Sequence, residues 1–186
     1  MNDLPSISLI LGFALVAKHF MALLVPTSFQ NFLKKFPRSR FWGVALLLLS
    51  TTWAFFLIAT TDLGEFSSLR LAILTGILVG GALFGWLVQE FLAVRSLGFI
   101  LLLLAHPVLE MTFLKSGLLP FLISLLAYAW IIAGLFMIGM PYLLRDLISF
   151  ISAPHRLRLY QLLCSAGLIY GLVLITEGGM LLLAQG

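Results

Sequence analysis

Charged side chains are scarce in this sequence. Asp, Glu, Lys and Arg together make up 10% of its 186 residues, whereas about a quarter of the residues of a soluble domain are charged. Hydrophobic residues account for 62%, and the mean hydropathy is +1.15. A soluble domain of this length could not bury so many apolar side chains in one core. The composition therefore excludes an ordinary soluble domain and predicts an integral membrane protein.

Reactive side chains and catalytic motifs are also missing. The one cysteine, Cys164, lies inside an apolar run and excludes an internal disulfide bond or a cysteine-rich metal site. The sequence contains no phosphate-binding loop, dinucleotide fingerprint, HExxH or GxSxG motif. Seven acidic residues and three histidines leave few groups for catalysis, which needs positioned acids, bases or metal ligands. We therefore predict that the chain is not an enzyme and holds no metal.

The chain is rich in long apolar segments. A helix that crosses a bilayer needs about 20 predominantly apolar residues, and six segments come close to or exceed this length. They cover residues 7–25, 41–59, 71–88, 97–114, 118–140 and 159–183. We predict an all-α fold in which residues 1–186 form a single transmembrane domain, a bundle of six transmembrane helices.

The distribution of Lys and Arg predicts the orientation of this bundle, because short cytoplasmic loops are enriched in both. Residues 26–40, 89–96 and 141–158 carry eight of the 11 Lys and Arg residues, and the opposite loops carry only Arg70 and Lys115. We predict that the three basic loops are cytoplasmic, that both chain ends lie outside, and that the membrane is a bacterial cytoplasmic membrane. The same bias explains the net charge of +4, so we expect no nucleic-acid partner. Four aromatic residues near the cytoplasmic helix ends fit an interfacial belt: Trp42, Trp86, Tyr142 and Tyr160.

Two of the basic segments are predicted to be short amphipathic helices in the cytoplasmic interface, over about residues 28–36 and 143–152. Each has apolar residues at i, i+3, i+4 and i+7, which is the spacing of one helix face. These residues are Phe29, Phe32, Leu33 and Phe36 in the first segment, and Leu144, Leu147, Ile148 and Ile151 in the second.

The two amphipathic segments belong to a longer pattern. An offset of 115 residues relates them, and the same offset relates Pro26 to Pro141. The order helix, proline, amphipathic helix, basic turn, helix thus occurs twice, which favours a parallel internal repeat of residues 7–59 and 118–183, as in some transporters. The alternative is that any membrane hairpin with a long cytoplasmic turn has this pattern.

Four polar residues stand out as candidates inside apolar segments, where a charged side chain costs about 2.5–3.5 kcal/mol on insertion scales. Lys18 and His19 lie in the first segment, and His106 and Glu110 share one face of the fourth, where Pro107 weakens the helix. We expect Lys18, His19 and His106 at similar depths, with Lys18 and Glu110 neutralising each other if these helices pack together. The sequence therefore suggests an intramembrane polar site. The alternatives are that Lys18 snorkels to water and that His106 makes an interhelical hydrogen bond.

A haem site is a further alternative. His19 and His106 are the one pair of histidines in apolar segments that could ligate a b-type haem. Small residues that would seat a porphyrin are not evident around either histidine, so our prediction is that the chain has no cofactor.

The third apolar segment contains Gly76, Gly80, Gly81 and Gly85, which form two GxxxG spacings. Small residues let helix backbones approach closely in lipid. We predict that these glycines pack against another helix of the same chain, and the alternative is that they drive self-association.

Two functions fit these observations. The first is a non-enzymatic accessory or scaffold component of the membrane, whose partners are the lipid bilayer and another membrane protein or a second copy of the chain. The alternative is a small transporter or proton- or ion-conducting protein that uses the Lys/His/Glu cluster.

Overall fold

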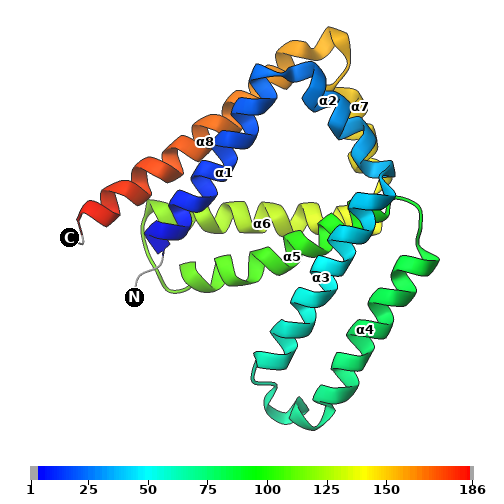
Figure 1. The fold of residues 1–186 in the computed structure, drawn as a ribbon. Helices are drawn as coiled ribbons and strands as arrows, with labels where there is room; N and C mark the ends of the chain where they lie inside the picture. Colours follow the sequence, from blue (N-terminus) through cyan, green and yellow to red (C-terminus); the bar gives the residue numbers. More distant parts are fainter. Residues whose placement is uncertain (1–3, 185–186) are drawn as a thin grey trace. The chain divides into compact units, whose positions relative to one another are not determined.

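The computed structural model describes residues 4–184, and this part of the chain is almost entirely helical (Figure 1). Six of its helical segments are long and apolar enough to cross a membrane, so the predicted all-α fold with six such helices is confirmed. The α-helices are α1 (Leu4–Leu24), α2 (Pro26–Lys35), α3 (Arg40–Thr60), α4 (Arg70–Leu87), α5 (Leu92–Thr112), α6 (Leu118–Gly139), α7 (Tyr142–Ile151) and α8 (Leu157–Leu183). Short 3-10 helices lie between them: η1 (Phe36–Arg38), η2 (Gly64–Leu69) and η3 (Pro154–Arg156). Both chain ends, for which we predict an outside location, fall outside the described residues.

The observed helix ends lie within three residues of the predicted ones, except at the start of α5. This helix begins at Leu92, five residues before the predicted start. The sequence predicts a turn over residues 89–96 that includes Arg95. However, Leu92 is 4% exposed and Val94 is 0% exposed, so the first turn of α5 is packed inside the protein. Phe91, with a φ of 55°, makes the bend just before it, and the predicted turn over residues 89–96 ends there.

The chain divides into two compact units. One unit comprises the chain up to Lys34, Ala105–Ala129, and the chain from Asp146 onward; the other comprises Lys35–Leu104 and Trp130–Arg145. Each unit is described by itself below.

In the first unit, α1 and α8 pack at very short range (Figure 1). A β-carbon on Gly12 would lie 2.8 Å from the Gly171 carbonyl oxygen, and one on Gly171 would lie 3.0 Å from the Gly12 carbonyl oxygen. The Ser8 hydroxyl, which is fully buried, donates a hydrogen bond to the Leu174 carbonyl across the same interface. Backbones can approach this closely only where side chains are absent, so these glycines determine the α1–α8 contact.

Pro26 explains a second contact between these helices. A proline has no N–H, so the Ala22 carbonyl of α1 cannot receive the usual bond from the residue four positions later. The Tyr160 hydroxyl of α8 donates to this carbonyl at 2.7 Å, in a buried position. Tyr160 is 4% exposed, so its predicted place in an interfacial aromatic belt is wrong. The phenol lies inside the protein, where it donates the hydrogen bond that the buried Ala22 carbonyl requires.

In the second unit, α3 and α4 form an antiparallel hairpin (Figure 1). The Arg70 guanidinium closes its η2 end by donating to the carbonyls of Ala59 at 3.0 Å and Thr61 at 2.8 Å. In the same unit, α5 and α6 approach at Gly98 and Gly134, where a β-carbon on Gly98 would lie 2.8 Å from the Gly134 carbonyl oxygen.

The order of elements is the same in two parts of the chain. The series α1, α2, η1, α3 matches α6, α7, η3, α8, and both α2 and α7 contain ten residues. The 3-10 helix of each series, η1 in the first and η3 in the second, has a proline in its first two positions. The structure thus has the element order expected of a repeat, and common ancestry of the two parts stays a prediction.

Candidate functional site

The first unit contains a cavity that is lined by both polar and apolar side chains. Its volume is about 240 Å³. The lining residues come from four helices: Lys18, His19 and Ala22 from α1, Phe29 and Leu33 from α2, Ile151 from α7, and Tyr160, Leu163 and Cys164 from α8. Two of the four predicted site residues, Lys18 and His19, therefore lie in one cavity.

The His19 ring is held between the Leu15 carbonyl of its own helix and Gly167 of α8. Its Nδ1 atom lies 2.8 Å from the Leu15 carbonyl oxygen, which can only accept, so Nδ1 carries the proton and donates. The other side of the ring lies against Gly167 of α8, where Nε2 is the atom nearest to the position of a β-carbon. Gly167 thus provides the space for the imidazole, and the histidine joins α1 to α8.

Lys18 has no such partner. Within the described part of the chain, no hydrogen bond or ion pair is formed by its ammonium group, and the side chain stays exposed beside the cavity. The other polar residues that line the cavity are His19, Tyr160 and Cys164, none of which is a carboxylate. Lys18 therefore lacks an anionic partner.

Tyr160 and Cys164 form the α8 side of the cavity. They are four residues apart and share one helix face, and both are buried with Ala22 in a cluster against which Phe29 and Ile151 pack. Cys164 is a free thiol. The Tyr160 hydroxyl is engaged with the Ala22 carbonyl and His19 Nδ1 with the Leu15 carbonyl, so neither group is free to bind the Lys18 ammonium.

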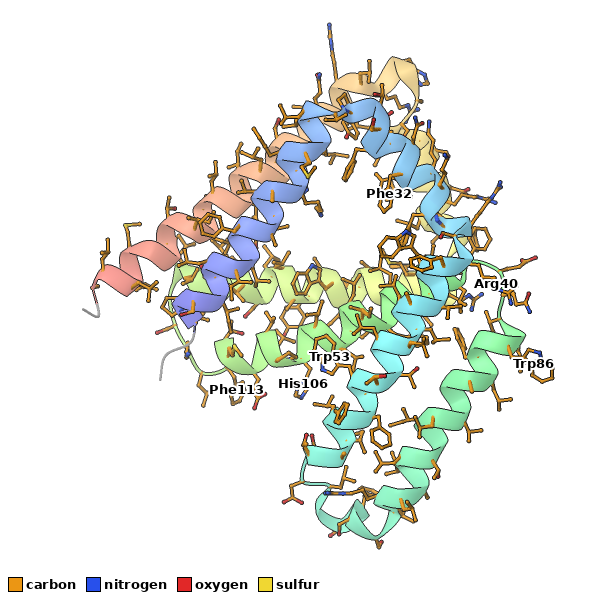
Figure 2. The ribbon with its side chains drawn as sticks, in the orientation of Figure 1. Phe32, Arg40, Trp53, Trp86, His106 and Phe113 are labelled. Carbon is orange, nitrogen blue, oxygen red and sulfur yellow. The ribbon has the colours of Figure 1, made fainter. Side chains whose placement is uncertain are left out.

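His106 and Glu110 lie elsewhere, near the C-terminal end of α5. Both side chains are exposed, and His106 projects from the side of α5 away from α6 in Figure 2. Along the described chain, no hydrogen bond or ion pair joins either residue to Lys18 or His19. At 1.5 Å per residue, His106 lies about 21 Å from the start of α5, whereas Lys18 lies about 9 Å from the end of α1. In the predicted orientation both distances are measured from the cytoplasmic helix ends, so they place His106 deeper than Lys18; the depths themselves stay a prediction.

The geometry also bears on the haem alternative. An axial ligand needs a ring nitrogen with a free lone pair facing the iron. In His19, Nδ1 is engaged with Leu15 and Nε2 faces the backbone of α8 at Gly167. One ring nitrogen of His19 is thus already engaged and the other lies beside Gly167, and the absence of a cofactor stays a prediction. In the described residues no group of three or more His, Cys, Asp or Glu could hold a metal ion.

The four glycines of α4 fall into two pairs. A β-carbon on Gly81 would lie 2.6 Å from Thr51 Oγ1, and one on Gly85 would lie 2.8 Å from Leu47 Cδ2, so both face α3. Gly76 and Gly80 would meet no atom within 4 Å. Gly80 and Gly81 also line an apolar cavity of about 360 Å³ between α3, α4 and α5.

Sequence reasoning missed several residues of this region. The spacing Gly167–Gly171 in α8 is a GxxxG motif, like those noted in α4, but it was not singled out. The sequence predicts Tyr160 to be interfacial and assigns Cys164 no role, whereas both residues line the cavity. Pro26 leaves the Ala22 carbonyl without its usual helical donor, so the sequence could have indicated that another group donates to it. It could not have identified Tyr160 as that donor, because this depends on which helix is adjacent.

No protein-family model, no curated protein and no solved structure matches this chain.

Proposed function

We propose that the chain is an integral protein of a bacterial cytoplasmic membrane whose six apolar helices cross the bilayer. In this proposal α2 and α7 lie in the cytoplasmic interface and both chain ends lie outside. The excess of Lys and Arg near α2, α7 and η3 supports this orientation. Three aromatic side chains also support this orientation. Trp42, Trp86 and Tyr142 lie near helix ends that we predict to be cytoplasmic, and they are 41%, 72% and 46% exposed.

Within that membrane, the chain acts as a non-enzymatic accessory or scaffold component. The observation that carries this proposal is the free face of α4. This helix has no buried residue; its Gly76 faces open space, and its Gly80 opens onto the apolar cavity beside α3 and α5, with no atom within 4 Å of a β-carbon at either glycine. Small residues on an uncovered face of a spanning helix allow a second helix to approach closely. A helix of another membrane protein is the occupant that fits best.

The test is native mass spectrometry of the tagged protein, extracted gently from its own membrane. We expect a membrane-protein partner at fixed stoichiometry. Gly76→Ile combined with Gly80→Ile should abolish this complex, because the larger side chains occupy the partner's place. The control is Gly179→Ile in α8, where the glycine also meets no atom within 4 Å. Recovery of the wild-type chain alone would contradict the proposal.

The second candidate is a small transporter or ion-conducting protein, and the cavity at Lys18 and His19 favours it. Purified protein in liposomes would then show pH-dependent flux that Lys18→Met abolishes without loss of the fold. Absence of flux, or flux that Lys18→Met leaves unchanged, would remove the basis for transport.

A further inference from the structure

Lys18 is a cation in the apolar helix α1, and its cavity contains no acidic side chain to balance the charge. Lys18 lies six residues before the end of α1, about 9 Å along the helix axis. The hydrocarbon core of a bilayer is about 30 Å thick, so the Lys18 backbone lies below the interface if α1 spans the membrane as proposed. A cation at such a depth is costly unless an anion or water accompanies it.

The other polar groups of the cavity do not supply that anion. The acidic residues are absent from its lining. His19 donates to Leu15, and the Tyr160 hydroxyl donates to Ala22. Cys164 is a buried cysteine and carries no carboxylate or phosphate oxygen. Any anion that pairs with Lys18 therefore comes from outside the described chain.

The remaining lining residues indicate what kind of molecule carries the anion. Phe29 and Leu33 from α2, Ile151 from α7 and Leu163 from α8 make the rest of the lining apolar. A free inorganic anion gains nothing from these walls, whereas the first carbons of a hydrocarbon chain bury apolar area against them. The volume of about 240 Å³ is below the roughly 300–1,000 Å³ usual for sites that enclose a whole small molecule. It suits a headgroup and the adjoining carbons, with the rest of the chain left in the bilayer.

We propose that this cavity binds an anionic amphiphile, an acyl chain that ends in a carboxylate or a phosphate, with its charged group on the Lys18 ammonium. The ligand enters from the cytoplasmic leaflet, next to α2 and α7. This inference rests on the proposed membrane insertion and orientation, but it is independent of a protein partner at α4.

The experiment measures binding of radiolabelled oleate to the full chain in neutral detergent, with oleyl alcohol as a probe of the same length without charge. We expect oleate to bind at one saturable site and oleyl alcohol to bind at least about tenfold more weakly, because it lacks the charge-assisted bond to Lys18. Lys18→Met keeps a side chain of similar length and should weaken oleate binding by a comparable factor. Lys115→Met, which removes a lysine outside the cavity, is the matched control and should bind as the wild type.

A second variant tests the cavity itself. Leu33→Trp keeps Lys18 but fills the apolar side, and it should also weaken oleate binding; thermal unfolding of each variant identifies any that fails to fold. Equal binding of oleate and oleyl alcohol, or unchanged binding by Lys18→Met, would overturn the proposal. Displacement of oleate by millimolar inorganic phosphate would show that the site takes a free anion, which would also overturn it. The native mass spectrometry result at α4 is unaffected by any of these outcomes.

Discussion

Tyr160 and Ala22 are 138 positions apart, yet their hydrogen bond follows from one local fact, the missing N–H of Pro26. Tyr160→Phe removes the donor and leaves a buried carbonyl unsatisfied, so we expect a loss of about 1–3 kcal/mol in the free energy of unfolding. Pro26→Ala restores an N–H in reach of Ala22, so Tyr160→Phe should cost less in that background. Reversible unfolding in mixed micelles measures both effects, and equal costs in the two backgrounds would contradict the explanation.

Gly167 is a second residue whose role depends on one neighbour. A methyl group there would overlap the His19 ring, so Gly167→Ala should destabilise the protein by about 1–3 kcal/mol, the usual cost of overpacking. Gly179→Ala, on the same helix with no atom within 4 Å, should be neutral or stabilising by up to about 1 kcal/mol. In the His19→Ala background the cost of Gly167→Ala should largely disappear, as a thermal-unfolding double-mutant cycle would show.

In the α3–α4 hairpin, two glycines of the GxxxG spacings in α4 have different surroundings: Gly81 packs against α3, and Gly76 does not. Both branches of Thr51 lie within 2.8 Å of a β-carbon on Gly81, so rotation of the threonine cannot relieve the overlap. Gly81→Ala should therefore lower the free energy of unfolding by about 1–3 kcal/mol, and Thr51→Ala should remove most of that penalty. Gly76→Ala is the control and should not destabilise the hairpin. A similar loss for both glycines would show that helix propensity, rather than packing against α3, controls stability here.

For the whole molecule, the distribution of Lys and Arg makes a prediction about topology. A reporter fused after Gly186 should be active outside the membrane, and one inserted in residues 145–158 should be active in the cytoplasm. Alkaline phosphatase and green fluorescent protein fusions distinguish the two sides. The reverse pattern would overturn the orientation, and with it the entry of an amphiphile from the cytoplasmic leaflet.

The candidate site was only partly predictable at this scale. Lys18 and His19 could be singled out because polar residues are rare in apolar segments, and the structure places both in one cavity. His106 and Glu110 were singled out by the same rule, but the described structure does not bring them to that cavity. The rule identifies unusual residues one helix at a time, whereas a site depends on which helices are neighbours.

The sequence by itself determined the helices, because the length of an apolar run, the position of a proline and an i, i+3, i+4, i+7 spacing are local properties of the chain. The bounds of α2 and α7 followed from such patterns to within two residues. Only the tertiary structure decided that α8 is the neighbour of α1, that Tyr160 points inward, and that Gly81 packs while Gly76 does not. Apolar faces of spanning helices resemble one another in sequence, and lipid covers them as well as a helix does. The choice of neighbours is therefore made by close shape complementarity between backbones, which no local pattern records.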